Sequence, residues 1–262
     1  MNAIERMSPR PGLRVLVTAG ASGIGAAIAG AFLVANAKVL ICDVDEPSLS
    51  GFAERHPEAS VVRADISDEG QVDALLDAAS ARLGGLDVLV NNAGIAGPTG
   101  TIDELSVEEI RRTLDIDLMG QFLVLRRAAP LLRASEAGSV INISSVAGRL
   151  GYALRTPYSA AKWGIVGLTQ SLAKEMGPDG IRVNAILPGV VRGVRIESVI
   201  RDRAAASGLS YEEMEAQYLS NISLRRMVEP EDVAAMALFL ASPGGANISG
   251  QAISVCGNVE NI

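Results

Sequence analysis

LRVLVTAGASGIG, residues 13–25, joins a short apolar, β-branched run to a glycine-rich turn. A run of this length and composition predicts a buried strand that ends near Thr18. The uncharged, alanine-rich sequence that follows, to about Ala35, predicts a helix that begins at the glycines. Glycines at such a junction let backbone amides approach a pyrophosphate, whose charge the helix N-terminus favours. We therefore interpret residues 13–35 as the start of a dinucleotide-binding fold.

The glycine spacing alone is a weak signal. The common G-x-G-x-x-G pattern does not fit, because Ile28 stands at its last position. A tight turn without a ligand would use the same glycines. Support comes from Asp43, at the end of the next predicted strand and 18 residues after Gly25. A carboxylate there accepts hydrogen bonds from an adenosine ribose, and the turn carries no Lys or Arg for a 2′-phosphate, so the sequence favours NAD over NADP.

Strand-like and helix-like segments alternate along most of the chain. Short apolar runs predict strands at residues 13–18, 38–42, 61–62, 88–90, 140–143, 182–187 and 252–255. Apolar residues at helical spacing and helix-start signals predict further helices at residues 68–83, 107–132, 156–176 and 230–241.

This alternation predicts a parallel sheet covered by helices on both faces. We expect an α/β fold in which residues 1–262 form a single doubly wound Rossmann-type domain with a seven-stranded parallel sheet. Ser67 is the expected cap of the helix that follows it, and Thr156 is the expected N-cap of another helix, with Pro157 in its first turn. Residues 193–226 break the alternation with charged, helix-forming sequence, and we expect them to form a substrate-binding lid.

Composition excludes several classes of protein. The 262 residues carry 23 Lys and Arg against 30 acids, and a net charge of −7 does not suit a sequence-independent nucleic-acid binder. Two cysteines and one histidine leave no disulfide framework, metal centre or Ser-His-Asp site, and suggest a reducing cytoplasm. Residues 1–12 lack the apolar core of a signal peptide, and the uncharged residues 15–35 are too glycine-rich to favour a membrane span.

A second signal lies at Ser145, Tyr158 and Lys162. The tyrosine and the lysine are four residues apart, on one face of a predicted helix, and Ser145 follows a predicted strand at the edge where open α/β sheets bind ligands. A phenol is a poor base at neutral pH until a nearby cation stabilises the phenolate. Lys162 can supply that cation and Ser145 can hold a substrate oxygen, although a surface Tyr–Lys pair would show the same spacing.

These motifs, in this order from about Leu13 to Val255, resemble those of the short-chain dehydrogenase/reductase family. The resemblance implies that Tyr158 is the general acid/base, that Ser145 orients the alcohol or carbonyl, and that Lys162 binds the nicotinamide ribose. The reaction that it implies, hydride transfer between a nicotinamide and the substrate carbon, requires no metal. The matching segments are the glycine turn (T-G-x-x-x-G-x-G in the family), Asn91-Asn92-Ala93-Gly94, the adenine-side acid Asp65, and Pro188-Gly189. The cofactor-binding residues that it implies are Gly20, Ser22, Gly23, Ile24, Gly25, Asp43, Asp65, Ile66, Asn92, Ala93, Gly94, Tyr158, Lys162, Pro188, Gly189 and Val191.

The chain departs from the family pattern at four places. Ala19 replaces the first glycine of the turn, so the backbone there has to accept a methyl group. Asp117 stands where the family usually has the Asn of its catalytic tetrad. A carboxylate therefore replaces a neutral amide at this catalytic position, so the family's proton relay does not transfer directly to it. Gly193 replaces a Thr that usually contacts the carboxamide, and residues 255–258 read V-C-G-N where V-D-G-G is usual.

The leading hypothesis is an NAD-dependent oxidoreductase that acts on a secondary alcohol or its ketone. The alternatives are an NADPH-dependent 3-oxoacyl-[acyl-carrier-protein] reductase and a catalytically silent dinucleotide sensor. The resemblance also implies a homotetramer packed through two long helices, in which Gly164 and Gly167 would allow close approach. A small-molecule substrate is expected, with neither nucleic acid nor membrane as a partner.

Arginines gather near the expected site and suggest an anionic substrate. Arg binds carboxylates through paired hydrogen bonds. The alternative is that these arginines pair with acids such as Glu197, or with a neighbouring subunit. Arg192 and Arg195 follow the Pro188-Gly189 turn, and the expected substrate residues are Arg149, Tyr152, Arg155 and Arg195, with Arg155 as the preferred anion contact.

Overall fold

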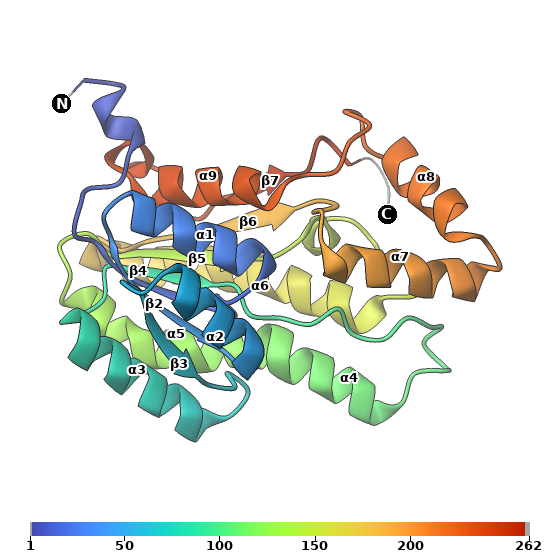
Figure 1. The fold of residues 1–262 in the computed structure, drawn as a ribbon, viewed down its shortest axis with the longest axis horizontal. Coiled ribbons are helices and arrows are strands. Elements are labelled where there is room, and N and C mark those ends of the chain that lie inside the picture. Colours follow the sequence, from blue (N-terminus) through green and yellow to red (C-terminus); the bar gives the residue numbers. More distant parts are fainter. Residues whose placement is uncertain (1, 260–262) are drawn as a thin grey trace.

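The computed structural model describes residues 2–259. Within them, one seven-stranded parallel sheet has the strand order β3-β2-β1-β4-β5-β6-β7, which confirms the predicted doubly wound Rossmann-type sheet (Figure 1). The strands are β1 (Arg14–Thr18), β2 (Lys38–Asp43), β3 (Ser60–Arg63), β4 (Val88–Asn91), β5 (Ser139–Ile143), β6 (Arg182–Pro188) and β7 (Ala252–Val255).

Helices cover both faces of this sheet (Figure 1). On one face lie α1 (Gly23–Val34), α2 (Glu46–Arg55) and α9 (Pro230–Ala241). On the other lie α3 (Glu69–Leu83), α5 (Gly120–Arg133) and α6 (Thr156–Met176), and α4 (Val107–Leu114) leads into α5. Within residues 2–259, no helix is both long enough and apolar enough to cross a bilayer.

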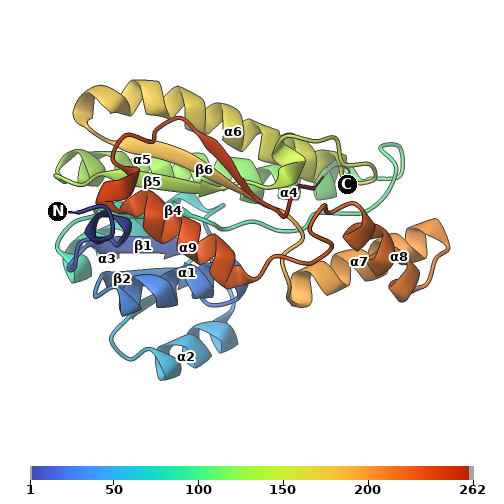
Figure 2. The ribbon, with the colours of Figure 1, turned by 90° about the horizontal axis from the view of Figure 1, so that it is seen from above.

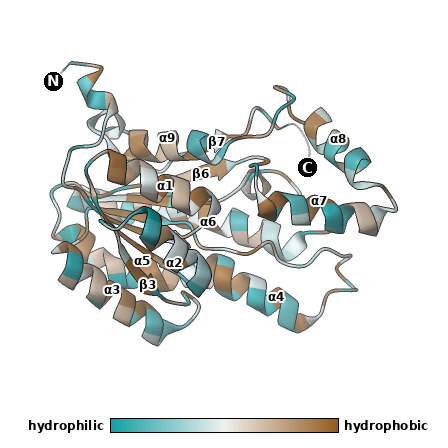
Figure 3. Ribbon diagram, viewed as in Figure 1, coloured by the Kyte–Doolittle hydropathy of each residue, from teal (hydrophilic) through white to brown (hydrophobic). Residues whose placement is uncertain are grey.

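The five central strands, β2, β1, β4, β5 and β6, are buried on both faces because successive side chains alternate between two separate apolar cores. Val15 and Val17 of β1 pack under α1, whereas Leu16 between them packs on the opposite side with Leu40 and Leu89. In Figure 3 the strands at the centre are largely brown, whereas most of the surrounding helices mix teal and brown residues. The near-continuous apolar runs in the sequence therefore have a direct structural reason.

The structure corrects several local predictions. The helix α2 was not expected, because Ser and Gly interrupt its apolar pattern and its core contacts come mainly from Leu49 and Phe52. The N-cap of α3 is Asp68, which accepts from the Gln71 amide, and not Ser67. Thr156 lies inside α6 and Arg155 occupies the cap position without a capping side-chain hydrogen bond to any described residue.

The segment 193–226 contains two helices, α7 (Val194–Ser207) and α8 (Tyr211–Ser220). Figure 2 shows them beside the body of the fold, at the end toward which the strands point. They form a small apolar core of their own, in which Ile200, Met214 and Tyr218 are buried. Such a segment can cover a ligand site at this sheet edge without taking part in the sheet.

At the amino ends of the strands, the carboxylate of Asp87 joins β1 to the start of β4. Asp87, just before β4, accepts hydrogen bonds from the Arg14 backbone amide (2.8 Å), the Arg14 Nε (2.9 Å) and the Ser135 hydroxyl (2.6 Å). Burial by itself would raise the pKa of Asp87, but the hydrogen bonds from Arg14 and Ser135 outweigh burial and lower it. The carboxylate thus ties β1 to β4, whose far ends flank the glycine turn.

We predict that Asp87→Asn lowers the free energy of unfolding at pH 7 by about 2 kcal/mol, because it weakens charged hydrogen bonds at a buried position. Since the folded-state pKa lies below the unfolded value near 3.9, this stabilisation is complete above about pH 5 and is lost as the pH falls through the folded pKa. Urea unfolding from pH 7 to pH 3 should show the two proteins converging in acid. Asp77→Asn, at an exposed ion pair with Arg127, is the matched control and should have little effect.

Candidate active site

A cavity of about 860 Å³ lies at the carboxyl ends of the strands, where open α/β sheets bind ligands. It brings together residues from the glycine turn, from the ends of β2, β4, β5 and β6, and from α6 and α7. Of the residues predicted to bind the cofactor, Gly20 alone does not line it, because Gly20 packs against β2: a Cβ there would lie 2.7 Å from the Ile41 side chain. The predicted cofactor residues that do line it are Ser22, Gly23, Ile24, Gly25, Asp43, Asp65, Ile66, Asn92, Ala93, Gly94, Tyr158, Lys162, Pro188, Gly189 and Val191.

Asn92 holds the glycine turn in place. Its side-chain amide donates to the carbonyl oxygens of Thr18 (2.9 Å) and Ala19 (3.0 Å). Its backbone amide donates to the Thr18 hydroxyl (2.9 Å). Ala19 adopts a left-handed conformation, with φ of 47°, which is why the family favours glycine at this position. A Cβ on Gly25 would overlap the Ala19 carbonyl and lie 2.6 Å from the Asn92 amide, so this glycine is required by close backbone contact.

The turn fits a dinucleotide. Ser22, at the N-cap of α1, makes no side-chain capping bond to a described residue, and the first turn of α1 holds no acid. By contrast, α2, α3, α4 and α8 are capped by their own side chains. Because Gly23, Ile24 and Gly25 line the cavity, the free amides at this helix start are available to an anionic pyrophosphate.

Two carboxylates lie at the β2–β3 side of the cavity. Asp43 accepts from the amides of Val44 (2.8 Å) and Ala21 (3.3 Å), which orient its carboxylate beside the turn. Asp65 accepts from the amide (2.9 Å) and the hydroxyl (2.7 Å) of Ser67. Both residues line the cavity, so this end offers hydrogen-bond acceptors and negative charge to an adenosine.

Ser145, Tyr158 and Lys162 meet at the other end of the same cavity. The Ser145 hydroxyl oxygen accepts from the Ala147 amide at 3.1 Å. Lys162 is 2% exposed, its Nζ donates to the Ile143 carbonyl at 3.3 Å, and the Nζ lies 5.5 Å from the centroid of the Tyr158 ring. The arrangement can hold a substrate oxygen and move a proton at the phenol, with a cation close enough to stabilise the phenolate.

Asp117 lies behind this group and does not line the cavity. The predicted long helix 107–132 is interrupted by a π-helical turn over Asp115–Met119, and this turn carries Asp117 with 0% exposure. One carboxylate oxygen accepts from the Ile95 amide at 2.6 Å, and the other lies 3.8 Å from Lys162 Nζ. Asp117 is therefore a buried ionic partner of Lys162.

The predicted substrate residues separate into two groups. Arg149 does not line the cavity. Its guanidinium donates to the Ala252 carbonyl (2.6 Å) and the Ser254 hydroxyl (3.1 Å), so the structure does not bring it to the predicted substrate site. Tyr152, Arg155 and Arg195 do line it. Arg192, also at the cavity, pairs with Glu229 at 2.9 Å, so the alternative of pairing with an acid applies to this residue, with a different acid from the one expected.

Residues of the 193–226 segment that sequence patterns did not single out complete this end. Tyr218 of α8 lines the cavity, and Arg203 of α7 lies with its Cζ 5.0 Å from the Tyr152 ring centroid and 5.5 Å from the Tyr218 ring centroid. Neither residue belongs to a motif. Only the general expectation of a lid pointed to this segment.

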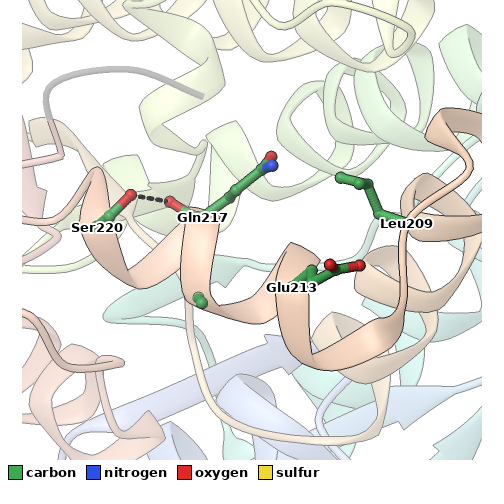
Figure 4. A pocket seen from close by; sticks show the side chains of 5 residues that line it. Leu209, Glu213, Gln217 and Ser220 are labelled. Atoms are coloured by element: carbon green, nitrogen blue, oxygen red, sulfur yellow. Dashed lines mark hydrogen bonds between the residues drawn. The ribbon is translucent and has the colours of Figure 1, made fainter.

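A second, open hollow lies along α8 and shares no residue with the large cavity (Figure 4). Its lining residues are Leu209, Glu213, Ala216, Gln217 and Ser220, and the Ser220 hydroxyl donates back to the Gln217 carbonyl of the same helix (Figure 4). It holds no group of residues arranged for chemistry. Across residues 2–259, no cluster of three or more His, Cys, Asp or Glu side chains is arranged to hold a metal.

Comparison with known proteins agrees with this geometry. A family model described as enoyl-(acyl carrier protein) reductase, one of the short-chain dehydrogenase/reductase models, matches residues 18–258. The chain belongs to the short-chain dehydrogenase/reductase family. Members of this family bind a nicotinamide cofactor, and the relatives are named as dehydrogenases and oxidoreductases that act on CH–OH groups. The protein is thus an enzyme of this family, and the silent-sensor alternative is set aside.

Three similar proteins show the range within the family. The cis-4-hydroxycyclohexanecarboxylate dehydrogenase of Sinomonas cyclohexanicum is 38% identical over 245 residues, which are 92% of this chain and 94% of the relative. An actinorhodin polyketide ketoreductase variant with NADPH has a TM-score of 0.89 and 34% identity, covering 96% of this chain and 98% of its own. A 3-ketoacyl-(acyl-carrier-protein) reductase from Brucella melitensis, complexed with NADH, has a TM-score of 0.85 and 30% identity, covering 95% and 99%.

We predict that Asp117→Asn keeps kcat within about tenfold of the wild-type value, a change of roughly 1.4 kcal/mol in the barrier. An amide oxygen can still accept from the Ile95 amide, so the position of Lys162 should persist although its ionic partner is gone. Asp117→Ala, which removes the acceptor as well, should lose more activity. Steady-state kinetics of both variants test this, and a rise in kcat well beyond tenfold for Asp117→Asn would contradict it.

Proposed function

We propose that this enzyme is an NAD-dependent oxidoreductase that interconverts a secondary alcohol and its ketone. The observation that carries the proposal is the meeting of Ser145, Tyr158 and Lys162 at one end of a cavity whose other end carries Asp43. Cofactor and substrate would share this crevice within a single domain. The relative from Sinomonas cyclohexanicum is named for such an alcohol, a hydroxycyclohexanecarboxylate, which supports the substrate class.

Each residue has a role that follows from its position. Tyr158 takes the hydroxyl proton during oxidation and returns it during reduction, and Ser145 holds the same oxygen in place. The Lys162 ammonium stabilises the phenolate and is available to the nicotinamide ribose, while Asp117 holds the ammonium in position. The bound nicotinamide supplies the hydride acceptor or donor. Residues 193–226 act as the lid that excludes water from the reacting carbon.

The preference for NAD rests on Asp43. Its carboxylate, held by the Val44 and Ala21 amides at the cavity wall, can accept from ribose hydroxyls and repels a 2′-phosphate. Glycine-turn residues offer no cation to that phosphate. The similar structures contain NADPH in one case and NADH in another, so the local charge and not the likeness supports this part of the proposal.

The alternative function is an NADPH-dependent 3-oxoacyl-[acyl-carrier-protein] reductase. The likeness to the Brucella melitensis reductase, which covers 95% of this chain, supports the reductase activity, but that structure holds NADH and gives no support to NADPH dependence. The alternative requires preference for NADPH and turnover of a 3-oxoacyl thioester. Turnover of such a thioester, measured with both cofactors, distinguishes the two proposals.

We also propose that the enzyme assembles as a homotetramer through α4, α5 and α6. Large apolar side chains on α5, on α6 and on the π-helical turn before α5 are exposed, including those of Phe122, Trp163 and Met119, which is unusual on a surface that stays in water. Gly167 has open space around it, as close approach of a neighbouring helix requires, whereas Gly164 packs against Leu118 of its own chain. A cytoplasmic location stays a prediction from the sequence.

We predict that Tyr158→Phe lowers kcat at least a hundredfold, because general acid–base catalysis is worth about 10²–10⁴ and Phe keeps only the packing of the ring. The dissociation constant for NAD, measured by fluorescence titration, should change little. Tyr211→Phe, in α8 and outside the cavity, is the control. Retention of a tenth of the wild-type kcat would overturn the assignment of Tyr158 as the acid/base.

We predict that kcat/KM with NAD exceeds that with NADP at least tenfold, and that Asp43→Ser narrows the ratio by a similar factor. In the wild-type enzyme the Asp43 carboxylate repels the 2′-phosphate and accepts from the ribose, and the variant loses both effects. Asp45→Ser is the control, since Asp45 caps α2 through the Ser48 amide and does not line the cavity. Equal kcat/KM values for the two cofactors in the wild-type enzyme would refute the preference.

A further inference from the structure

Three guanidinium groups and three tyrosine rings interleave at the Tyr158 end of the cavity; we call these six residues the arginine–tyrosine cluster. The Cζ of Arg155 lies 5.0 Å from the ring centroid of Tyr158 and 5.3 Å from that of Tyr152. The Cζ of Arg195 lies 5.9 Å from the Tyr158 centroid, on the α7 side. The cluster consists of Tyr152, Arg155, Tyr158, Arg195, Arg203 and Tyr218.

The cations of this cluster have no acidic partner among the described residues. Arg155, Arg195 and Arg203 form no ion pair with any of these residues, whereas Arg192, near Arg195 in the chain, pairs with Glu229. The neighbouring ammonium group of Lys162 is paired with Asp117. Arg195 donates to the Gly94 carbonyl at 3.1 Å, a neutral acceptor that leaves its charge uncompensated.

Arg155 carries the argument because it is buried. It is 2% exposed, it donates to the Ala96 carbonyl, and its Nε has no hydrogen-bond partner among the described residues. A buried charge without a counterion is destabilising, and the cation–π contacts with the two rings offset this cost only in part. A buried donor without a partner at a cavity wall is the place where an anionic ligand group gains most.

The neighbouring tyrosines do not supply the missing negative charge. The hydroxyls of Tyr152 and Tyr218 form a hydrogen bond with each other, and the Tyr218 hydroxyl accepts from Arg203 at 3.3 Å. Burial raises the pKa of the Tyr218 phenol, so this group stays neutral at physiological pH. The cluster therefore keeps its positive charge.

Charge is also segregated along the cavity. Its described acidic lining residues are Asp43, the last residue of β2, and Asp65, which follows β3, both at one side of the sheet. Arg155, Lys162 and Arg195 line the side formed by α6 and α7. An anionic group of a substrate is thus repelled from the first side and attracted to the second, next to the reacting alcohol.

We propose that the substrate is a hydroxy acid or keto acid whose carboxylate binds the guanidinium groups of Arg155 and Arg195 beside Tyr158. This rests on the proposed oxidoreductase function and names the substrate class of the same site. The substrate carboxylate accepts from the Nε of Arg155 and balances the positive charge of the two guanidinium groups, while the alcohol oxygen lies at Tyr158 and Ser145. The lid contributes Arg195 directly, so closure of residues 193–226 completes the anion site.

The test compares each acid with its primary carboxamide, which has nearly the same shape and no charge. The probes are 3-hydroxybutanoate, 4-hydroxypentanoate, and cis- and trans-4-hydroxycyclohexanecarboxylate, assayed with NAD. We expect kcat/KM for at least one acid to exceed that of its amide at least tenfold. Arg155→Met should reduce this acid-to-amide ratio at least tenfold, and Arg195→Met should reduce it in the same direction. Arg149→Met, which changes an arginine of the same loop that points away from the cavity, should leave the ratio unchanged.

Binding measured without turnover keeps the two proposals separate. Cyclohexanecarboxylate and cyclohexanecarboxamide are titrated calorimetrically into the enzyme–NAD complex, and we expect the acid to bind at least tenfold more tightly, with the preference lost in Arg195→Met. This second variant, at the lid, decides the matter if Arg155→Met does not fold. Amides turned over as well as acids would overturn the carboxylate site and leave the oxidoreductase function intact. Acid binding without turnover of any probe would support the site and contradict the assigned reaction. A larger dissociation constant for NAD in Arg195→Met, with an unchanged preference for the acid over the amide, would overturn the assignment of Arg195.

Discussion

The clamp from Asn92 to the carbonyls of Thr18 and Ala19 is the interaction on which the nucleotide end of the crevice depends. It joins the end of β4 to the turn after β1, and so keeps a left-handed alanine and the close approach of Gly25 in one arrangement. The N-terminal amides of α1 then line the cavity, free of side-chain caps from the described residues. The Asn92 side chain, just after β4, thereby fixes the backbone of the turn at the cavity wall.

Charge organises the rest of the crevice. The acids at the carboxyl ends of β2 and β3 and the cations of α6 and α7 line opposite sides of one cavity, and the order of the strands in the sheet sets their separation. Asp117 adds a buried charge behind Lys162 where the family usually has a neutral amide. The charge of Lys162 is therefore balanced by Asp117 from within the protein, whereas the charges of Arg155 and Arg195 are not balanced by any described acid.

Much of the fold and of the cofactor end was predictable from local patterns. Apolar runs marked all seven strands. In the five central strands the reason is that a parallel strand buried on both faces has to be apolar at nearly every position. The helix α2 escaped, since its two principal core residues leave no clear periodicity, and the π turn at Asp115–Met119 escaped because one extra residue in a helical turn barely disturbs an apolar pattern. Gly20 shows the limit of motif transfer: it belongs to the motif and packs on β2 instead of lining the cavity.

The sequence by itself determined the sheet, the position of the glycine turn, the acid at the end of β2 and the grouping of Ser145, Tyr158 and Lys162, because each depends on short-range periodicity or on a fixed spacing along one element. The tertiary structure alone decided which arginines reach the cavity. Arg149 and Arg155 lie six residues apart on one loop, yet the first bonds β7 and the second packs between two tyrosine rings. It also brought Arg203 and Tyr218 to Tyr152. Loop direction and contacts between distant segments come from the packing of whole elements, which leaves no periodic trace in the chain.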